Sequence, residues 1–252
     1  MSVRASTPKR APTVCVVVPT LDESAWVAPL LSRLQRSPQD RDRADRVVVV
    51  DGGSRDATVE LARTLGAEVR TAPRGRGSQL AAGAIGARED VLFFLHADCM
   101  PEVGALAAVR AAFEDTGLAA CGMRQRIDAE GRFYRLVERA ANARVRRLGL
   151  VYGDSGLCVR RVAYEAVGGF RPQPLFEDVD LSRRLRGASR PRLIESAVLR
   201  VSPRRWQREG PLRATFRNWI LQVRYAAGAD PERLARRYAP HPPESGHPRG
   251  TQ

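Results

Sequence analysis

Polar residues and glycines follow each of four short apolar stretches in the first hundred residues, and side chains in such places can bind a ligand. The four segments are Thr20-Leu21-Asp22-Glu23, Asp51-Gly52-Gly53-Ser54-Arg55-Asp56, Arg74-Gly75-Arg76-Gly77-Ser78 and His96-Ala97-Asp98. A single acidic residue in such a place is usually a helix N-cap, and Ser54 or Asp56 fits that role alone. Four such segments in succession favour a ligand site.

The first three segments suit a ligand that carries a nucleoside and a diphosphate. Carboxylates such as Asp22 and Asp51 accept hydrogen bonds from a base and a ribose, and Gly52 lets the backbone approach closely. Arg74 and Arg76 stand just before a predicted helix, where guanidinium and backbone N–H groups bind phosphates. The loop lacks the residue order of a P-loop or of a dinucleotide fingerprint, so a flexible turn stays open as its alternative.

The fourth segment is a candidate metal site. Asp98 emerges from the apolar run Val91–Leu95, and a carboxylate there costs stability unless it is paired, solvated or bound to metal. Mg²⁺ or Mn²⁺, held by carboxylates and the phosphates of a ligand, would satisfy it. The alternative is that Asp98 caps the helix that follows.

A later acidic segment, Phe176-Glu177-Asp178-Val179-Asp180, precedes an Arg-rich helical pattern. Paired acids at a helix start are commonly N-cap and dipole partners. The functional alternative is that one carboxylate, Asp178, removes a proton from an attacking hydroxyl group. The pattern alone leaves both interpretations open.

The elements that must position these residues alternate between strands and helices. Strands are predicted at Val14–Val18, Val47–Val50, Glu68–Thr71 and Val91–Leu95, and helical spacing of apolar residues occupies 26–36, 57–65 and 79–87. This alternation predicts βαβ units, an α/β fold and a mainly parallel, doubly wound sheet flanked by helices. Ligands of such sheets bind at the carboxyl ends of the strands, where the four segments lie.

The second half of the chain has a mixed pattern. Helices are predicted near 103–114, 133–148, after Glu177 and at 212–227, with strands near 118–125, 156–160 and 193–201. We therefore expect one domain over 13–206, with a nucleotide-binding half at 13–98 and an acceptor half at 99–206. A helical extension over 207–238 follows it, and residues 1–12 and 239–252 are predicted to be disordered.

The charge of the chain has two open explanations. Lys+Arg number 42 against 28 Asp+Glu, a net charge of +14, which suits anionic partners. Lys9 is the only lysine, so a compositional bias toward arginine competes with that explanation.

The four cysteines lack paired metal-ligand spacing and indicate buried thiols in a reducing compartment. With no signal-peptide pattern and no apolar stretch of membrane-spanning length, the expected location is the cytoplasm.

Taken in order, the motifs resemble those of family 2 glycosyltransferases with a GT-A fold. The matching segments are Val-Val-Pro-Thr-Leu-Asp-Glu, Val-Asp-Gly-Gly-Ser-Arg-Asp, Gly-Arg-Gly, Phe-Leu-His-Ala-Asp and Phe-Glu-Asp-Val-Asp, between about Val14 and Trp206. The chain looks especially similar to a compact bacterial subgroup with a His-Ala-Asp metal motif and a late Arg-Trp-x-x-Glu-Gly stretch, here Arg205 to Gly210.

The resemblance implies inverting, single-displacement transfer from a UDP- or GDP-sugar with a divalent metal. The residues implied on the donor side are Thr20, Asp22, Glu23, Asp51, Gly52, Arg74, Arg76 and Asp98. Asp98 would be the metal-coordinating acid, and His96 either ligates the metal or only hydrogen-bonds at the strand end. Asp178, next to Glu177, would be the general base.

On the acceptor side the resemblance places Asp154, Arg205 and Trp206, although the turn Gly-Asp-Ser-Gly explains Asp154 equally well. Arg205 and Trp206 correspond to the Arg-Trp of the Q-x-x-R-W motif of processive members, but Ser202 stands where that Gln would be. Together with the absence of membrane-spanning segments, this departure argues for a non-processive enzyme. The acceptor stays unidentified.

Two other functions compete. A sugar-phosphate nucleotidyltransferase would carry a glycine-rich, basic loop after the first strand, where this chain has Pro19–Glu23. A nucleic-acid-binding protein would explain the arginine excess, but no binding motif or aromatic platform supports it, and we expect no nucleic-acid partner. The amphipathic region Arg213–Tyr225 can contact the cytoplasmic membrane face, although docking on the protein's own core is the favoured interpretation.

Overall fold

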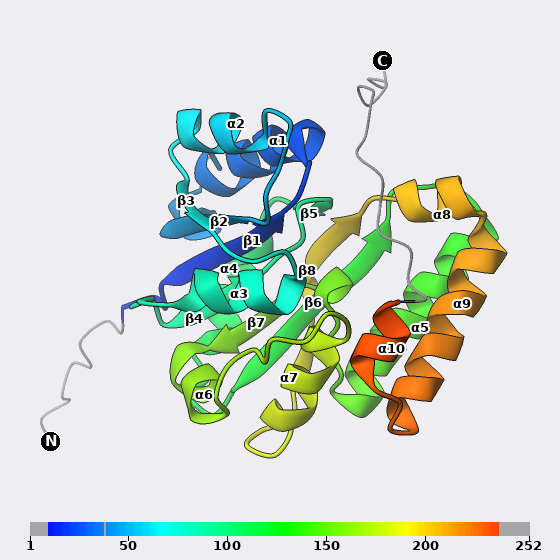
Figure 1. Cartoon of the computed structure of the whole chain (residues 1–252). Helices are drawn as coiled ribbons and strands as arrows, with labels where there is room; N and C mark the ends of the chain where they lie inside the picture. The colour runs from blue at the N-terminus through cyan, green and yellow to red at the C-terminus, as the bar shows by residue number, and fades with distance from the viewer. Residues whose placement is uncertain (1–9, 38, 237–252) are drawn as a thin grey trace, which may run out of the picture.

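The computed structural model describes residues 10–37 and 39–236, which form one eight-stranded sheet with helices on both faces (Figure 1). The strand order is β3-β2-β1-β4-β7-β6-β8-β5. The strands are β1 Val14–Thr20, β2 Arg46–Asp51, β3 Glu68–Thr71, β4 Val91–Phe94, β5 Cys99–Pro101, β6 Ala120–Ile127, β7 Leu157–Arg160 and β8 Arg192–Val201.

The first four strands are all parallel to one another. Their carboxyl ends therefore lie at one edge of the sheet, as the sequence predicted. Strand β1 has no polar position before Thr20 because alternate residues face two different cores: Val16 and Val18 contact one, and Cys15 and Val17 contact the other.

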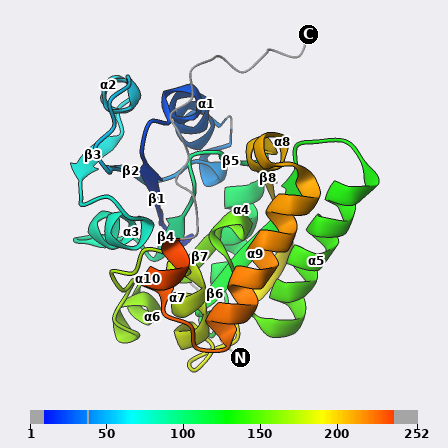
Figure 2. The same cartoon turned by 45° about the vertical axis from the view of Figure 1, so that its right-hand side comes forward.

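The helices divide between these two cores. Helices α1 Ser24–Gln35, α2 Thr58–Thr64 and α4 Ala105–Phe113 cover one face, and α3 Arg76–Ala84, α6 Arg161–Ala166 and α7 Glu177–Leu185 cover the other. The long helix α5 Arg132–Leu148 and the C-terminal helices α8 Arg204–Glu209, α9 Pro211–Ala226 and α10 Pro231–Ala235 lie together at one end of the sheet (Figure 2). Two 3₁₀ turns, η1 Asp40–Asp42 and η2 Gly153–Ser155, complete the described elements.

The two predicted halves share the same sheet. Strand β4 pairs antiparallel with β7, β7 pairs antiparallel with β6, and β6 runs parallel to β8, so the sheet continues across residue 98 without a boundary. Strand β5 and helix α6 were not predicted, because elements of three and six residues are too short to show a period.

The helical extension begins at Arg204 in α8, earlier than the predicted start at 207, and it packs onto the rest of the chain. Trp206 and Ala214 belong to the larger core, whereas Leu221 and Leu234 form a small separate cluster with Leu175. No helix within residues 10–37 and 39–236 combines the length and apolar character needed to cross a bilayer.

The predicted disordered ends lie outside the described residues, apart from residues 10–12. These three residues are held in place. The Arg10 guanidinium pairs with Asp90 at 3.1 Å, and the Pro12 carbonyl accepts a hydrogen bond from Arg110.

A buried ion pair fixes the segment that follows the predicted metal motif. Arg33 pairs with Asp42 at 2.7 Å and donates to the carbonyls of Pro101, at 2.9 Å, and Glu102, at 2.6 Å. The Asp42 carboxylate also accepts from the backbone N–H of Gly104 at the start of α4. This buried ion pair therefore connects α1, η1, β5 and α4.

Replacing Asp42 with Ala should lower the free energy of unfolding by about 3 kcal/mol, because Arg33 would keep a largely buried charge without its partner. Burial alone would raise the pKa of Asp42, but hydrogen bonds from Gly104 and Ser37 and the charge of Arg33 lower it. The contribution is thus present at neutral pH and is lost as the pH falls through that lowered pKa. Urea unfolding measures the effect. Asp40→Ala, on the exposed side of the same turn, is the matched control and should change stability little. Equal effects of the two variants would contradict the prediction.

Candidate active site

The loops after β1 and β2 are joined to each other by hydrogen bonds. The Asp22 N–H donates to Ser54 Oγ at 2.9 Å, and the Arg55 N–H donates to Asp22 Oδ1 at 2.7 Å. Asp22 adopts a left-handed backbone conformation with φ of 54°, which is uncommon for a residue other than glycine. The two predicted nucleoside-binding loops therefore form one surface at the sheet edge.

Asp51 is almost fully buried and directs its carboxylate into its own turn. It accepts from the backbone N–H groups of Gly53, at 2.8 Å, and Ser54, at 2.9 Å, and from the Ser54 hydroxyl. The hydroxyl of buried Thr20 also faces it, at 3.4 Å. Thr20 and Asp51 therefore lie beneath the surface of the sheet edge and support it through these hydrogen bonds.

Gln79 of α3 contributes to the same edge, and the sequence analysis missed it. Its amide nitrogen donates to the carbonyls of Thr20, at 2.9 Å, and Val50, at 2.8 Å. A Cβ added at Gly52 would lie 3.0 Å from that nitrogen, so the glycine admits this close contact. The sign of this role in the sequence is that Gln79 is the single polar residue of the predicted helix 79–87.

Arg204 at the start of α8 joins two predicted site residues that are far apart in the sequence. Its terminal nitrogens bind both carboxylate oxygens of Glu23, at 2.7 and 2.8 Å, and its Nε donates to Asp98 Oδ2 at 2.9 Å. All three side chains are largely buried, which strengthens the attraction between their charges. No motif in the sequence distinguishes Arg204 from the many other arginines of the chain.

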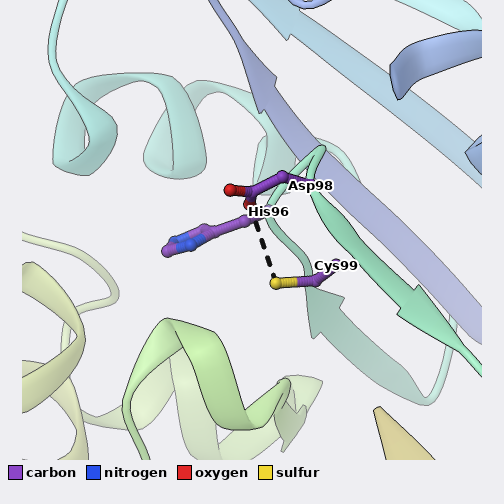
Figure 3. A group of neighbouring side chains, drawn as sticks. All are labelled: His96, Asp98 and Cys99. Carbon is purple, nitrogen blue, oxygen red and sulfur yellow. Dashed lines mark hydrogen bonds between the residues drawn. The ribbon is translucent and has the colours of Figure 1, made fainter. Parts of the chain in front are cut away.

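His96, Asp98 and Cys99 form a group of possible metal ligands in the loop after β4 and at the start of β5 (Figure 3). Their ligand atoms all lie within 4.8 Å of one another. Burial, and then the charge of Arg76, lowers the pKa of His96 to about 3, so its imidazole is neutral at physiological pH. A neutral imidazole is the form that can bind a metal.

Asp98 and Cys99 differ in their suitability as ligands. Burial alone would raise the pKa of Asp98, but Arg204 and the other neighbouring charges lower it, so Asp98 is a carboxylate. Burial, and then the charge of Asp98, raises the pKa of the Cys99 thiol well above its ordinary value, which disfavours the thiolate that binds metals. The donor set that fits a divalent cation is therefore one imidazole and one carboxylate.

The paired acids at the start of α7 are not its N-cap. The N-cap residue is Phe176, with φ of 63°, and no side chain caps the helix there. Asp178 instead reaches across to η2, where its Oδ2 accepts from the Gly153 N–H at 2.5 Å, and its Oδ1 accepts from the Val179 N–H at 2.7 Å. Neither Glu177 nor Asp178 is therefore the N-cap, although both stand in the first turn of α7, where acidic residues suit the helix dipole.

Both carboxyl groups hold their protons more tightly than usual. Burial, followed by the charge of Asp178, raises the pKa of Glu177 to about 7. Burial also raises the pKa of Asp178, with a further contribution from Asp154. A carboxyl group whose pKa moves toward neutrality is suited to accept a proton from a substrate.

Gly153 connects the metal-ligand group to the acidic pair. A Cβ at this position would lie 2.4 Å from His96 Nε2, so the imidazole rests directly on the glycine backbone. The N–H of the same residue holds Asp178. His96 and Asp178, which lie far apart in the sequence, thus both contact Gly153.

One cavity of about 160 Å³ collects most of the predicted site residues. Those that line it are Arg76, His96, Asp98, Asp154, Glu177, Asp178, Arg205 and Trp206. The others do not line it, although all lie at or beyond the carboxyl ends of β1, β2 and β3: Thr20, Asp22, Glu23, Asp51, Gly52 and Arg74. The predicted residues therefore divide between a cavity and the sheet edge, with Arg204 between the two.

The cavity wall also contains Tyr152, next to the predicted turn at Asp154, and two residues that the sequence did not indicate. Tyr152 stacks under Arg144, whose guanidinium carbon lies 3.5 Å from the ring centroid, and Arg144 approaches Asp154 at 3.5 Å. Helix α9 supplies Asn218 and Gln222. No motif marks these two residues, because only the docking of α9 brings them to the site.

Residues 15–172 match the sequence profile described as Glycosyl transferase family 2, which is more than half of the chain and ends before the acidic pair. A search of curated proteins returned no match.

Several solved structures share the fold at low identity. A mannosyltransferase from Pyrobaculum calidifontis, in complex with GDP-Man and Mn²⁺, is 19% identical with a TM-score of 0.62, covering 93% of this chain and 81% of that one. S. aureus TarS 1-349 is 17% identical with a TM-score of 0.62, covering 88% and 68%. Glucosyl-3-phosphoglycerate synthase from Mycobacterium tuberculosis, in complex with Mn²⁺, UDP and its product, is 20% identical with a TM-score of 0.57, covering 87% and 81%.

This chain spans 65% of a further mycobacterial protein of similar fold. Identities of this size establish the fold, and the profile match over residues 15–172 establishes the family. The α/β architecture, with its mostly parallel sheet flanked by helices, agrees with both. The chain belongs to glycosyl transferase family 2 and has the GT-A fold of these glycosyltransferases.

Proposed function

We propose that this protein is an inverting, metal-dependent, non-processive glycosyltransferase that moves a sugar from a UDP- or GDP-sugar to an acceptor hydroxyl. The observation that carries the proposal is the contact of both reaction centres with Gly153. The neutral imidazole of His96 lies against this residue, and the carboxyl group of Asp178 accepts its N–H. A cation site and a proton acceptor thus share one cavity.

The donor would lie across the cavity and the sheet edge. At about 160 Å³ the cavity is smaller than the roughly 300–1,000 Å³ of typical ligand pockets, so it suits the sugar and the diphosphate. The nucleoside would lie on the surface built by Asp22 and Gly52, with Thr20 and Asp51 beneath it. Arg76, in the first turn of α3 and in the cavity wall, would bind phosphate, with Arg74 nearby. The Pyrobaculum and mycobacterial relatives with bound GDP-Man and UDP support this class of donor.

His96 and Asp98 would hold the divalent cation, with Mg²⁺ or Mn²⁺ as the candidates. When bound, the cation would supply positive charge that stabilises the departing diphosphate. Arg204 now neutralises Asp98 and would share that carboxylate with the cation, while Glu23 keeps Arg204 in place.

Asp178 would take the proton of the acceptor hydroxyl as its oxygen attacks the sugar carbon. The new carbon–oxygen bond forms on the face opposite the diphosphate, whose bond to the sugar breaks, so a single displacement inverts the configuration. The raised pKa of Asp178 favours proton transfer to it. Glu177, with a pKa raised to about 7, is largely protonated below neutral pH and adds little repulsion there. Asp154, Arg205 and Trp206 would form the acceptor side.

Non-processive transfer and a cytoplasmic location complete the proposal. Ser202 lines the cavity where processive members carry a glutamine, so the partner of their Arg-Trp pair is missing. The four cysteines are free and buried, which suits a reducing compartment.

A screen of nucleotide sugars should find one preferred donor whose binding depends on metal. We expect a UDP- or GDP-sugar to raise the melting temperature with Mn²⁺ and much less without it. In Asp98→Asn the Mn²⁺-dependent part of the shift should vanish, because the variant lacks a charged metal ligand. Asp128→Asn, which changes an exposed residue directly after β6, is the control. The absence of a response to any nucleotide sugar would contradict the proposed function.

Replacing Asp178 with Asn should lower kcat by about a thousandfold and leave the dissociation constant of the donor nearly unchanged, because only the proton acceptor is lost. Single-turnover kinetics and calorimetric donor binding measure the two effects. Asp180→Asn, in the same helix turn but paired with Arg184, is the matched control and should retain kcat. If donor binding and kcat fell together in Asp178→Asn, the residue would have a structural role.

Glu177→Gln should stabilise the protein above pH 7 and leave its stability unchanged in acid. The pKa of Glu177 rises from an ordinary 4.5 to about 7 in the folded protein. Between these values the unfolded chain releases the proton and the folded chain keeps it, so the wild type loses stability as the pH rises, by up to about 3 kcal/mol. Glutamine has no proton to release. Urea unfolding across this range, with exposed Glu165→Gln as control, is the measurement, and equal pH profiles of Glu177→Gln and the wild type would show that the pKa is not raised.

A further inference from the structure

One face of α9 carries five large apolar side chains that are exposed to solvent. Their exposed fractions run from 39% to 73%, and the residues are Leu212, Phe216, Trp219, Ile220 and Val223. The spacing of four, three, one and three residues places them on one stripe of the helix, which we call the α9 stripe. Single exposed apolar residues are ordinary, but a contiguous group marks an interaction surface.

The stripe is not the side by which α9 docks on the protein. Ala214 is buried in the larger core, Leu221 is buried in the small cluster with Leu175 and Leu234, and Tyr225 stacks on Phe176 with ring centroids 4.7 Å apart. The sequence analysis favoured docking of the apolar residues of this region on the protein's own core. That expectation is wrong for Trp219, Ile220 and Val223, which are exposed because they lie on the opposite side of the helix from Ala214 and Leu221.

Arginines border the stripe. Arg213, Arg217 and Arg224 recur every four and seven residues and so form a row along one side of it, and α9 contains no acidic residue. Arg213 and Arg224 are exposed, whereas Arg217 pairs with Glu209. Helix α5, which lies beside α9 in both views, is itself rich in arginine (Figures 1 and 2).

We propose that the α9 stripe binds the surface of an anionic phospholipid bilayer. A helix with Trp, Phe and aliphatic side chains on one face and arginines beside it inserts the apolar face among lipid chains and holds anionic headgroups with the arginines. A second copy of the chain fits less well, because the contact would bring two arginine-rich surfaces together.

Because of the position of the stripe, a bilayer bound to it would lie close to an approach to the active-site cavity. The inner side of α9 lines the active-site cavity with Asn218, Leu221 and Gln222. A second cavity of about 250 Å³ lies between α5 and α9 and reaches Trp219 of the stripe. It shares Asp154, Trp206, Asn218 and Gln222 with the active-site cavity. A bilayer against α9 thus contacts the helix whose inner side lines the same cavity as Asp178.

Vesicle co-sedimentation of the full chain tests the proposal. We expect binding to phosphatidylcholine vesicles that contain phosphatidylglycerol, weak binding to pure phosphatidylcholine, and loss of binding at high salt. The triple change Phe216→Ser, Trp219→Ser and Val223→Ser should weaken binding at least about tenfold. Ile85→Ser with Val162→Ser, which removes exposed apolar residues elsewhere, should leave it unchanged.

A charge-reversal pair, Arg213→Glu with Arg224→Glu, gives a second measurement that does not depend on folding of the triple variant, and it should weaken binding to a similar degree. The proposal is overturned by equal binding of the triple variant and the wild type, by equal binding to both vesicle types, or by no binding to either. Self-association that the triple variant abolishes, without vesicle binding, would assign the stripe to a second copy. Donor binding is measured on the same variants and should not change, so this result is separable from the proposed transfer function.

Discussion

Burial of the sheet on both faces is the constraint on which the rest of this structure depends. A strand such as β1 contacts one core with Val16 and the other with Val17, so no polar side chain fits before the strand ends. The polar residues therefore stand just beyond the carboxyl ends of β1, β2 and β4, which parallel pairing brings to one edge. A ligand site is the consequence of this arrangement, because the buried strands leave the edge as the place where polar groups can gather.

Charges at that edge hold together segments that lie far apart in the sequence. Arg204 binds Glu23 and Asp98 in a largely buried cluster, where each charge requires the others for compensation. Gly153 adds a second connection, between the His96 imidazole and the Asp178 carboxylate. The C-terminal helices are thus part of the site: α8 supplies Arg204, α9 supplies a cavity wall, and the stacking of Phe176 on Tyr225 ties α9 to the start of α7.

Helices α9 and α7 show which questions a sequence pattern leaves open. The apolar residues of α9 have the spacing of an amphipathic helix, and spacing cannot distinguish a face that docks on a core from one that stays exposed. Likewise, the pattern at Glu177 and Asp178 fitted an N-cap, yet Phe176 takes that position and Asp178 contacts η2. In both cases the pattern was correctly recognised, and the choice between its two meanings required knowledge of the neighbouring elements.

The sequence by itself determined the α/β alternation, the parallel strand ends and the identity of most cavity residues, because buried strands and helices impose local periods that a linear pattern records. Only the tertiary structure decided that Arg204 neutralises Asp98, that Asp51 is directed into its own turn, and that Asn218 and Gln222 line the cavity. These contacts join residues from different elements, and their energies come from burial and from charge pairing across the sheet edge. No local period carries that information, because contacts such as these exist only where α8 and α9 pack near the carboxyl ends of the strands.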